Sequence, residues 1–391
     1  MTVKRIADGV YYTGTVDWDR RTFDELVEIP RGTSYNSYLI RGSGASALID
    51  TTEPSRAGEL LKNLDSVGVE PDYIISQHAE QDHSGALPEL IERYPDAEVL
   101  GTAPCLELLE NLLDFRGDMR AIKDGEKLSL GDKTLEFRVT PWVHWPDTMV
   151  TYLEEEGILF SCDFFGSHLA TSELMEERPG EILREARRYY AHIMMPFPQM
   201  VRSNLRKISD LDISIIAPSH GPLIMEPGMI MDAYSHWSSG GSGKTVILHV
   251  TMHGSTEIMV SRLTEALMEH DVSVRPLNVA SADSGELLTE LVDASFLVIA
   301  SPTVLTGPHP KIAAALYLTG AMRPPIKYAA VVGSYGWGTR IESEVKGILS
   351  RLNLEYLDPV LVKGLPGDED LEGLDELALK ISELGGEYFG K

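Results

Sequence analysis

The sequence has 391 residues, 43% of them hydrophobic and 24% charged, and carries a formal net charge of −26. Length and composition predict a globular protein of two or three domains, and the acidic charge argues against nucleic acid and anionic membrane as partners. No signal-peptide segment or apolar run of roughly 20 residues is present, and two cysteines give no disulfide framework, so we expect a cytoplasmic protein.

The first part of the chain contains predicted strands and helices of ordinary length. Strands are expected where apolar residues run together, at residues 35–40, 47–50, 73–76, 135–139, 149–153, 158–160 and 213–217. Helices are expected after a cap at Ser55, from Pro104, and over residues 182–192. The serine- and glycine-rich segment 238–243 is the most linker-like stretch, and it predicts a domain boundary between residues 240 and 241.

The second part alternates strands with helices, which predicts a parallel sheet. Strands are expected at residues 244–250, 296–300 and 329–333. Helices are expected over residues 258–267, 284–292 (with Ser284 as the cap), 310–318 and 374–384.

Two imidazoles and two carboxylates follow the predicted strand at residues 73–76 within six positions. They are His78, Glu80, Asp82 and His83. The chain has only 11 histidines, so a solvated polar loop is the less favoured interpretation. Such groups can converge where a loop leaves the end of a strand.

Three further candidate ligands also follow predicted strands: His144, Asp163 and His220. Functional groups gather at the carboxyl ends of strands in α/β layers, so these side chains can meet the first four. Four imidazoles and three carboxylates exceed the needs of one tetrahedral ion and suit two metals with a bridging carboxylate. Ligand type alone leaves zinc, iron and manganese open.

Three loops of the second part have the composition of a cofactor site. The loop after residues 244–250 combines hydroxyls with a glycine ahead of a helix, as in a phosphate cradle, although alone it is a weak signal. The other two loops add hydroxyls and two aromatic rings on which a flat cofactor could stack. The candidate residues are Thr251, Met252, His253, Gly254, Ser255, Thr256, Pro302, Thr303, Val304, Ser334, Tyr335, Gly336, Trp337 and Gly338.

Taken together, these motifs resemble the flavodiiron proteins, or A-type flavoproteins, over essentially the full chain. The run from His78 to His83, His-Trp-Pro-Asp at His144, Asp163 and Ser-His-Gly-Pro at His220 match that family's metal motif in order. The resemblance implies an N-terminal αββα metallo-β-lactamase-like sandwich over residues 1–240 and a C-terminal flavodoxin-like doubly wound parallel sheet over residues 241–391. Simple hydrolases of the first fold carry a histidine where Glu80 stands. His192 departs from the family pattern, in which asparagine is usual.

The resemblance also implies the ligand sets and the activity. His78, Glu80 and His144 would hold one iron, Asp82, His83 and His220 the other, and Asp163 would bridge them. FMN would pass electrons to the two irons, which would reduce dioxygen to water or nitric oxide to nitrous oxide. A rubredoxin or a reduced deazaflavin coenzyme would be the external donor, and the chain would form a head-to-tail homodimer or a dimer of dimers.

Two other hypotheses for the function remain open from the sequence. The first is a metal-dependent hydrolase of the metallo-β-lactamase type fused to a flavodoxin-like electron-transfer domain, against which Glu80 argues. The second is a pure electron carrier with a vestigial metal domain, against which the complete set of seven candidate ligands argues. The sequence does not rank dioxygen against nitric oxide.

Overall fold

The computed structural model describes residues 3–113, 117–175 and 178–386. The chain divides into two compact units, Met1–Ser238 and Ser239–Lys391. This division falls two residues before the boundary expected between residues 240 and 241. In the described part of the chain, no helix is both long and apolar enough to cross a membrane.

The first unit contains two large sheets. The first sheet has the strand order β1 (Lys4–Ala7), β2 (Val10–Tyr12), β7 (Tyr38–Arg41), β8 (Ser46–Ile49), β9 (Tyr73–Ile75), β10 (Glu98–Gly101) and β11 (Met119–Ala121). The second has the order β12 (Lys127–Ser129), β13 (Thr134–Val139), β14 (Met149–Leu153), β15 (Ile158–Cys162) and β16 (Ile215–Pro218). Two short ribbons pair β3 (Thr15–Asp17) with β6 (Thr33–Tyr35), and β4 (Thr22–Phe23) with β5 (Val27–Glu28).

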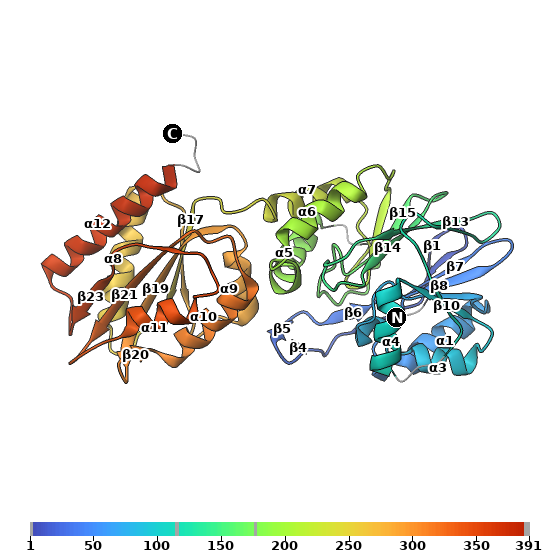
Figure 1. The fold of residues 1–391 in the computed structure, drawn as a ribbon, viewed down its shortest axis with the longest axis horizontal. Helices are drawn as coiled ribbons and strands as arrows, with labels where there is room; N and C mark the ends of the chain where they lie inside the picture. The colour runs from blue at the N-terminus through green and yellow to red at the C-terminus, as the bar shows by residue number, and fades with distance from the viewer. Residues whose placement is uncertain (1–2, 114–116, 176–177, 387–391) are drawn as a thin grey trace. The chain divides into compact units, whose positions relative to one another are not determined.

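Alternation along the strands builds the four-layer αββα sandwich. In β8, Ala47 and Ile49 point into the core between the two sheets, whereas Leu48 points into the core under the helices. Strands buried on both faces read as continuous apolar runs. Figure 1 shows α1 (Ala57–Val67), α3 (Leu87–Arg93) and α4 (Ala103–Leu113) on the side of the first sheet, and α5 (Pro179–Tyr189), α6 (Pro198–Lys207) and α7 (Pro227–Trp237) on the side of the second.

The second unit is a doubly wound parallel sheet. Its strand order is β18 (Val274–Asn278), β17 (Lys244–His249), β19 (Ala294–Val304) and β21 (Tyr328–Tyr335), with β22 (Glu355–Tyr356) and β23 (Val360–Lys363) both pairing β21 and the short β20 (Gly307–Pro308) pairing β19. This is the 2-1-3-4-5 order of flavodoxin-like folds. One face packs against α8 (Ser255–Glu269) and α12 (Asp368–Gly385). The helices α9 (Ser284–Leu291), α10 (Pro310–Met322) and α11 (Ile341–Ile348) lie on the other face (Figure 1).

Three local expectations are wrong. Ser55 is not a helix cap, because Pro54 starts a 3-10 turn over Pro54–Arg56 and α1 begins after it. Asp283, rather than Ser284, caps α9, and its carboxylate accepts a hydrogen bond from the backbone N–H of Glu286. The expected strand at residues 35–40 is two strands, β6 and β7, because the chain passes from a ribbon to the first large sheet between them.

Both cysteines are fully buried and free. Cys105 lies in α4, and Cys162 ends β15. Burial raises the pKa of both thiols well above the usual value.

Candidate functional site

The seven candidate metal ligands come from segments that leave the ends of four strands. His78 and Glu80 lie on the loop after β9, and Asp82 and His83 lie in the short helix α2 (Gln81–Ser84) that follows. His144 lies between β13 and β14, Asp163 follows β15, and His220 follows β16. The structure brings all seven together at one edge of the sandwich, in two groups.

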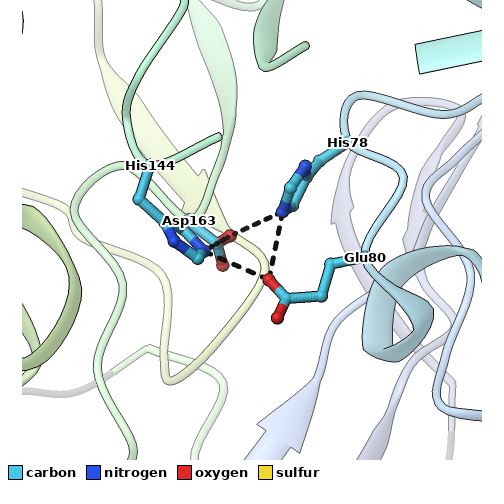
Figure 2. A group of neighbouring side chains, drawn as sticks. All are labelled: His78, Glu80, His144 and Asp163. Carbon is cyan, nitrogen blue, oxygen red and sulfur yellow. Dashed lines mark hydrogen bonds and ion pairs between the residues drawn. The ribbon is translucent and has the colours of Figure 1, made fainter. Parts of the chain in front are cut away.

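The first group contains His78, Glu80, His144 and Asp163 (Figure 2). Glu80 Oε2 lies 3.1 Å from Nε2 of His78 and 3.1 Å from Nε2 of His144. Asp163 Oδ2 lies 3.3 Å from His144 Nε2 and 3.7 Å from His78 Nε2. Bonds of about 2.0–2.2 Å to a divalent transition metal separate adjacent donor atoms by about 3–3.5 Å, so these spacings suit one ion.

The second group contains Asp82, His83 and His220. Asp82 lies 3.3 Å from His83 Nε2 through Oδ1 and 3.0 Å from His220 Nε2 through Oδ2. Asp163 turns its other oxygen to this group, with Oδ1 at 3.1 Å from His83 Nε2 and 3.5 Å from His220 Nε2. Asp163 therefore presents one carboxylate oxygen to each group, which is the geometry of a bridging ligand.

Unpaired buried atoms test whether this cluster fits metal ions. Both carboxylate oxygens of Asp82, both ring nitrogens of His83 and Oδ2 of Asp163 are buried and lack a hydrogen-bond partner among the described residues. Leaving a buried polar atom unbonded costs about 1–3 kcal/mol, so a cluster of five needs a compensating partner. Buried imidazole and carboxylate donors aimed at one another fit a pair of transition-metal ions.

The electrostatics of the site favour a cation. Burial alone would lower the pKa of the imidazoles, but the neighbouring carboxylates outweigh it and raise the pKa of His78, His83 and His144 to about 10. Burial opposes the charged form of Glu80 and Asp163, yet the imidazoles hold the pKa of both carboxyls below the usual value. Donors that hold protons this strongly also bind metal cations, with release of those protons.

Residues outside the ligand set orient the candidate ligands through hydrogen bonds. Asp147 is fully buried and accepts from His78 Nδ1 at 3.2 Å and from the Ala79 backbone N–H at 2.8 Å, which leaves His78 Nε2 to face the cluster. Asp147 belongs to the His-Trp-Pro-Asp motif, so its place beside the ligands has a sequence signal. Tyr189 donates its hydroxyl to Asp163 Oδ1 at 2.7 Å. This contact has no sequence signal, because a tyrosine on an amphipathic helix is normally interpreted as a core residue. His192, the departure from the family pattern, is buried in a π-helical turn and lies outside both ligand groups.

A pocket of about 360 Å³ reaches the cluster from outside. Its lining includes Glu80 and Asp82, one candidate ligand from each group. Phe23, Leu112 and Trp145 supply apolar walls. Arg20, Asp24, Glu53 and Gln81 also line it, so the pocket has both polar and apolar walls and is large enough for a small molecule.

In the second unit, the three predicted cofactor loops line one pocket of about 190 Å³. They lie where β17, β19 and β21 end, and ten of the predicted residues line the pocket: Thr251, Met252, His253, Ser255, Thr256, Pro302, Thr303, Ser334, Tyr335 and Gly336. Gly254, Val304, Trp337 and Gly338 lie in the same loops but outside the lining. Gly364, which the sequence does not indicate, also lines the pocket from the end of β23.

The geometry of this pocket fits a phosphate-bearing flat cofactor. Thr256 is 1% exposed in the first turn of the 15-residue helix α8, and its hydroxyl has no hydrogen-bond partner in the described ranges. Gly254, at φ 91°, caps this helix and leaves open space where a side chain would stand. The helix N-terminus and this hydroxyl therefore suit a phosphate dianion. Trp337, 90% exposed, offers a ring beside the pocket loop.

Comparisons with known proteins agree with this two-part organisation. A family model described as an ODP family beta lactamase matches residues 33–221. The chain is 36% identical to the nitric oxide reductase of Moorella thermoacetica (96% of this chain, 97% of the relative), and 35% identical to the coenzyme F420H(2) oxidase of Methanothermobacter marburgensis (97% and 98%).

Solved structures match over both units. The rubredoxin oxygen:oxidoreductase of Desulfovibrio gigas superimposes with a TM-score of 0.92 at 29% identity, over 100% of both chains. The flavodiiron protein of Giardia intestinalis superimposes with a TM-score of 0.90 at 26% identity, over 99% of this chain and 98% of that one.

Proposed function

The chain belongs to the flavodiiron protein family, also called type A flavoproteins, and from this premise we propose that it passes electrons from FMN to a non-haem di-iron site that reduces dioxygen, nitric oxide or both. The products are water and nitrous oxide, respectively. The observation that carries the proposal is the convergence of seven donors, five buried and two partly buried, into two groups that share Asp163.

Within this proposal, His78, Glu80 and His144 would hold one iron, Asp82, His83 and His220 the other, and Asp163 would bridge them. The residues at the pocket of the second unit would hold FMN, with Thr256 and the start of α8 on its phosphate. When bound, the flavin accepts electrons in pairs and releases them singly to metals that change oxidation state, which zinc cannot do.

Neighbouring residues position the ligands and leave a path to them. Asp147 keeps the Nδ1 proton of His78 and so leaves Nε2 as the ligand atom. Tyr189 orients the shared carboxylate through its hydrogen bond to Asp163 Oδ1. The pocket that Phe23, Leu112 and Trp145 share with polar residues gives a small molecule a path to Glu80 and Asp82.

The other readings have less support. Relatives that match across nearly the whole chain are named as oxidoreductases, which does not favour a hydrolase with an attached flavodoxin-like domain. A vestigial metal domain is not favoured either, because every donor faces another within its group.

The external donor, the assembly and the compartment are further parts of the proposal. We propose a rubredoxin or a reduced deazaflavin coenzyme as donor, since relatives named for each match both units. We also propose a head-to-tail homodimer or a dimer of dimers, which would bring one subunit's FMN beside the other's irons, in a cytoplasmic protein.

The test is anaerobic reduction of the bound flavin with each donor, followed by timed exposure to each gas. We expect flavin reoxidation together with water or nitrous oxide formation, in protein that holds two irons and one FMN per chain. Protein from iron-replete cells that holds zinc, or a reduced flavin that neither gas reoxidises, would refute the proposal.

A further inference from the structure

The loop that carries His220 is held by the segment just before β7. Ser34 accepts from His220 Nδ1 through its carbonyl at 2.6 Å, and its hydroxyl accepts from the Gly221 N–H at 2.8 Å. Tyr38 donates its hydroxyl to the Pro218 carbonyl at 2.7 Å. The loop is therefore hydrogen-bonded to a neighbouring segment at both of its ends.

Asn36 makes the densest set of these bonds. Its Nδ2 donates to the carbonyls of Pro218 at 2.7 Å and Gly221 at 2.8 Å, which flank His220 on both sides. Its backbone N–H donates to the Ser219 carbonyl at 2.8 Å. Asn36 therefore bonds three of the four residues from Pro218 to Gly221.

The side chain at position 36 must be a donor. Two carbonyl oxygens face it, and a carboxamide nitrogen has two hydrogens to give them, whereas a carboxylate has none. Asn36 is 1% exposed, and its Oδ1 is buried with no hydrogen-bond partner in the part of the chain that the structure describes. An amide with one unbonded buried oxygen is costly, and it is offset here by the two bonds on its nitrogen.

The group that contains His78 and His144 is supported by different contacts. Its histidine His78 is oriented by Asp147, and the loop before His144 is bonded at Pro141 by the amide of Asn204 at 3.0 Å. The two halves of the cluster therefore have separate supports and share Asp163.

We propose that Asn36 is a positioning residue for the second metal of the pair, because it shapes the loop that aims His220 Nε2 at Asp82. This inference rests on the proposed di-iron function. Removing the donor at position 36 lowers iron affinity in the Asp82, His83 and His220 group by about 10-fold, the lower end of the effect of losing a direct outer contact to a ligand, because Asn36 bonds the residues on either side of His220 and not its ring. The His78, Glu80 and His144 group keeps its iron.

The experiment compares Asn36→Asp and Asn36→Ala with wild-type protein and with Asn63→Asp. Asn63 is the matched control, because its Nδ2 also donates to two carbonyls, those of Thr13 at 2.9 Å and Gly14 at 3.1 Å, in a segment without metal ligands. Iron and FMN per chain are measured together with the electron paramagnetic resonance signal of the half-reduced iron pair and the circular dichroism spectrum. Asn36→Ser, whose hydroxyl can donate to one carbonyl, should retain an intermediate iron content.

We expect the folded Asn36 variants to keep FMN and one iron while losing the second iron and the coupled signal, with Asn63→Asp matching wild type. Retention of both irons in either Asn36 variant would overturn the inference. Loss of both irons together with FMN or the native spectrum would also overturn it, because it would show a role in overall folding. A wild-type protein that lacks the iron pair would instead refute the proposed function itself.

Discussion

The two candidate sites of this protein are built from different materials. The candidate metal site consists of side chains: seven imidazoles and carboxylates, five of them buried and two partly buried, with Asp147, Tyr189 and Ser34 hydrogen-bonded to the ligands. The flavin pocket consists of three loop ends, a helix N-terminus and glycines. The ring of Trp337 beside it is 90% exposed, whereas Tyr335 is partly buried.

This difference determines how strongly a single substitution affects each site. A metal site built from side-chain donors loses its function when one donor is replaced, because nothing else in the buried cluster supplies a lone pair in that place. In a phosphate-binding loop, several backbone N–H groups and hydroxyls each bind the anion, so one replacement removes only a fraction of the binding free energy. Substitutions of similar size in the two sites test this contrast.

The largest expected effect is that of Asp163→Asn. The amide keeps the shape of Asp163 but loses the negative charge that both ligand groups share, so iron affinity at both positions should fall by more than about 100-fold. Iron analysis and gas reduction check the result, while FMN content should stay at the wild-type value. Two retained irons would show that the bridge is dispensable.

Asp147→Asn should have the next largest effect. The carboxylate fixes the tautomer of His78, and loss of such a partner usually lowers metal affinity about 10- to 100-fold. Iron titration of the metal-free protein measures the change. Unaltered iron affinity in a folded variant would contradict the positioning role.

In the flavin pocket, Thr256→Val should weaken FMN binding about 10-fold or somewhat more, the effect of removing one hydrogen bond to a charged group. Flavin titration of the FMN-free protein measures it. Thr264→Val is the matched control, because that hydroxyl bonds the Val260 carbonyl within the same helix and lies outside the pocket lining. If Thr256→Val binds FMN as tightly as the wild type, the Thr256 hydroxyl is not part of the phosphate site.

The smallest effect concerns an ion pair outside both sites. Burial raises the pKa of Asp17, but the hydrogen bond and charge of Arg56, 2.9 Å away, outweigh burial and lower it. Because the folded pKa lies below the unfolded value of about 3.9, the pair stabilises the fold above that pH, by about 1 kcal/mol, and loses this contribution as pH falls through the folded pKa. Unfolding curves of wild type and Asp17→Asn should therefore differ at pH 7 and converge in acid.

A constant difference between the two unfolding curves down to the most acid pH would contradict this assignment.

The Asp17→Asn variant also tests the metal site, because Asp17 ends β3 and β3 pairs with β6, which carries Ser34. Loss of the pair leaves Ser34 its own bonds to His220 and Gly221, so iron content should stay unchanged in Asp17→Asn.

Much of the fold and most of the candidate ligands are predictable from sequence for a physical reason. Imidazoles and carboxylates carry their chemistry in the side chain, and His144, Asp163 and His220 each follow an apolar run that becomes a strand. The βαβ alternation of the second unit is visible in the same way, and its strand order agrees with the flavodoxin-like expectation.

The supporting residues are harder to find, because their roles depend on contacts that are distant in sequence. Tyr189 reaches Asp163 across 26 positions, and Asn36 reaches Pro218 across 182. Both stand inside segments that read as ordinary structural elements. Gly364 lines the candidate flavin pocket because the short strand β23 returns beside β21. The apolar run in Val360–Lys363 is typical of a strand, but the sequence alone does not show which strand it pairs with.

The buried cysteines have a consequence for a protein that handles oxidising gases. A cysteine is susceptible to nitrosation and oxidation when its thiolate is accessible to solvent. Here both sulfur atoms are shielded from solvent and kept in the protonated form. Neither cysteine therefore presents a solvent-accessible thiolate for nitrosation or sulfenic acid formation.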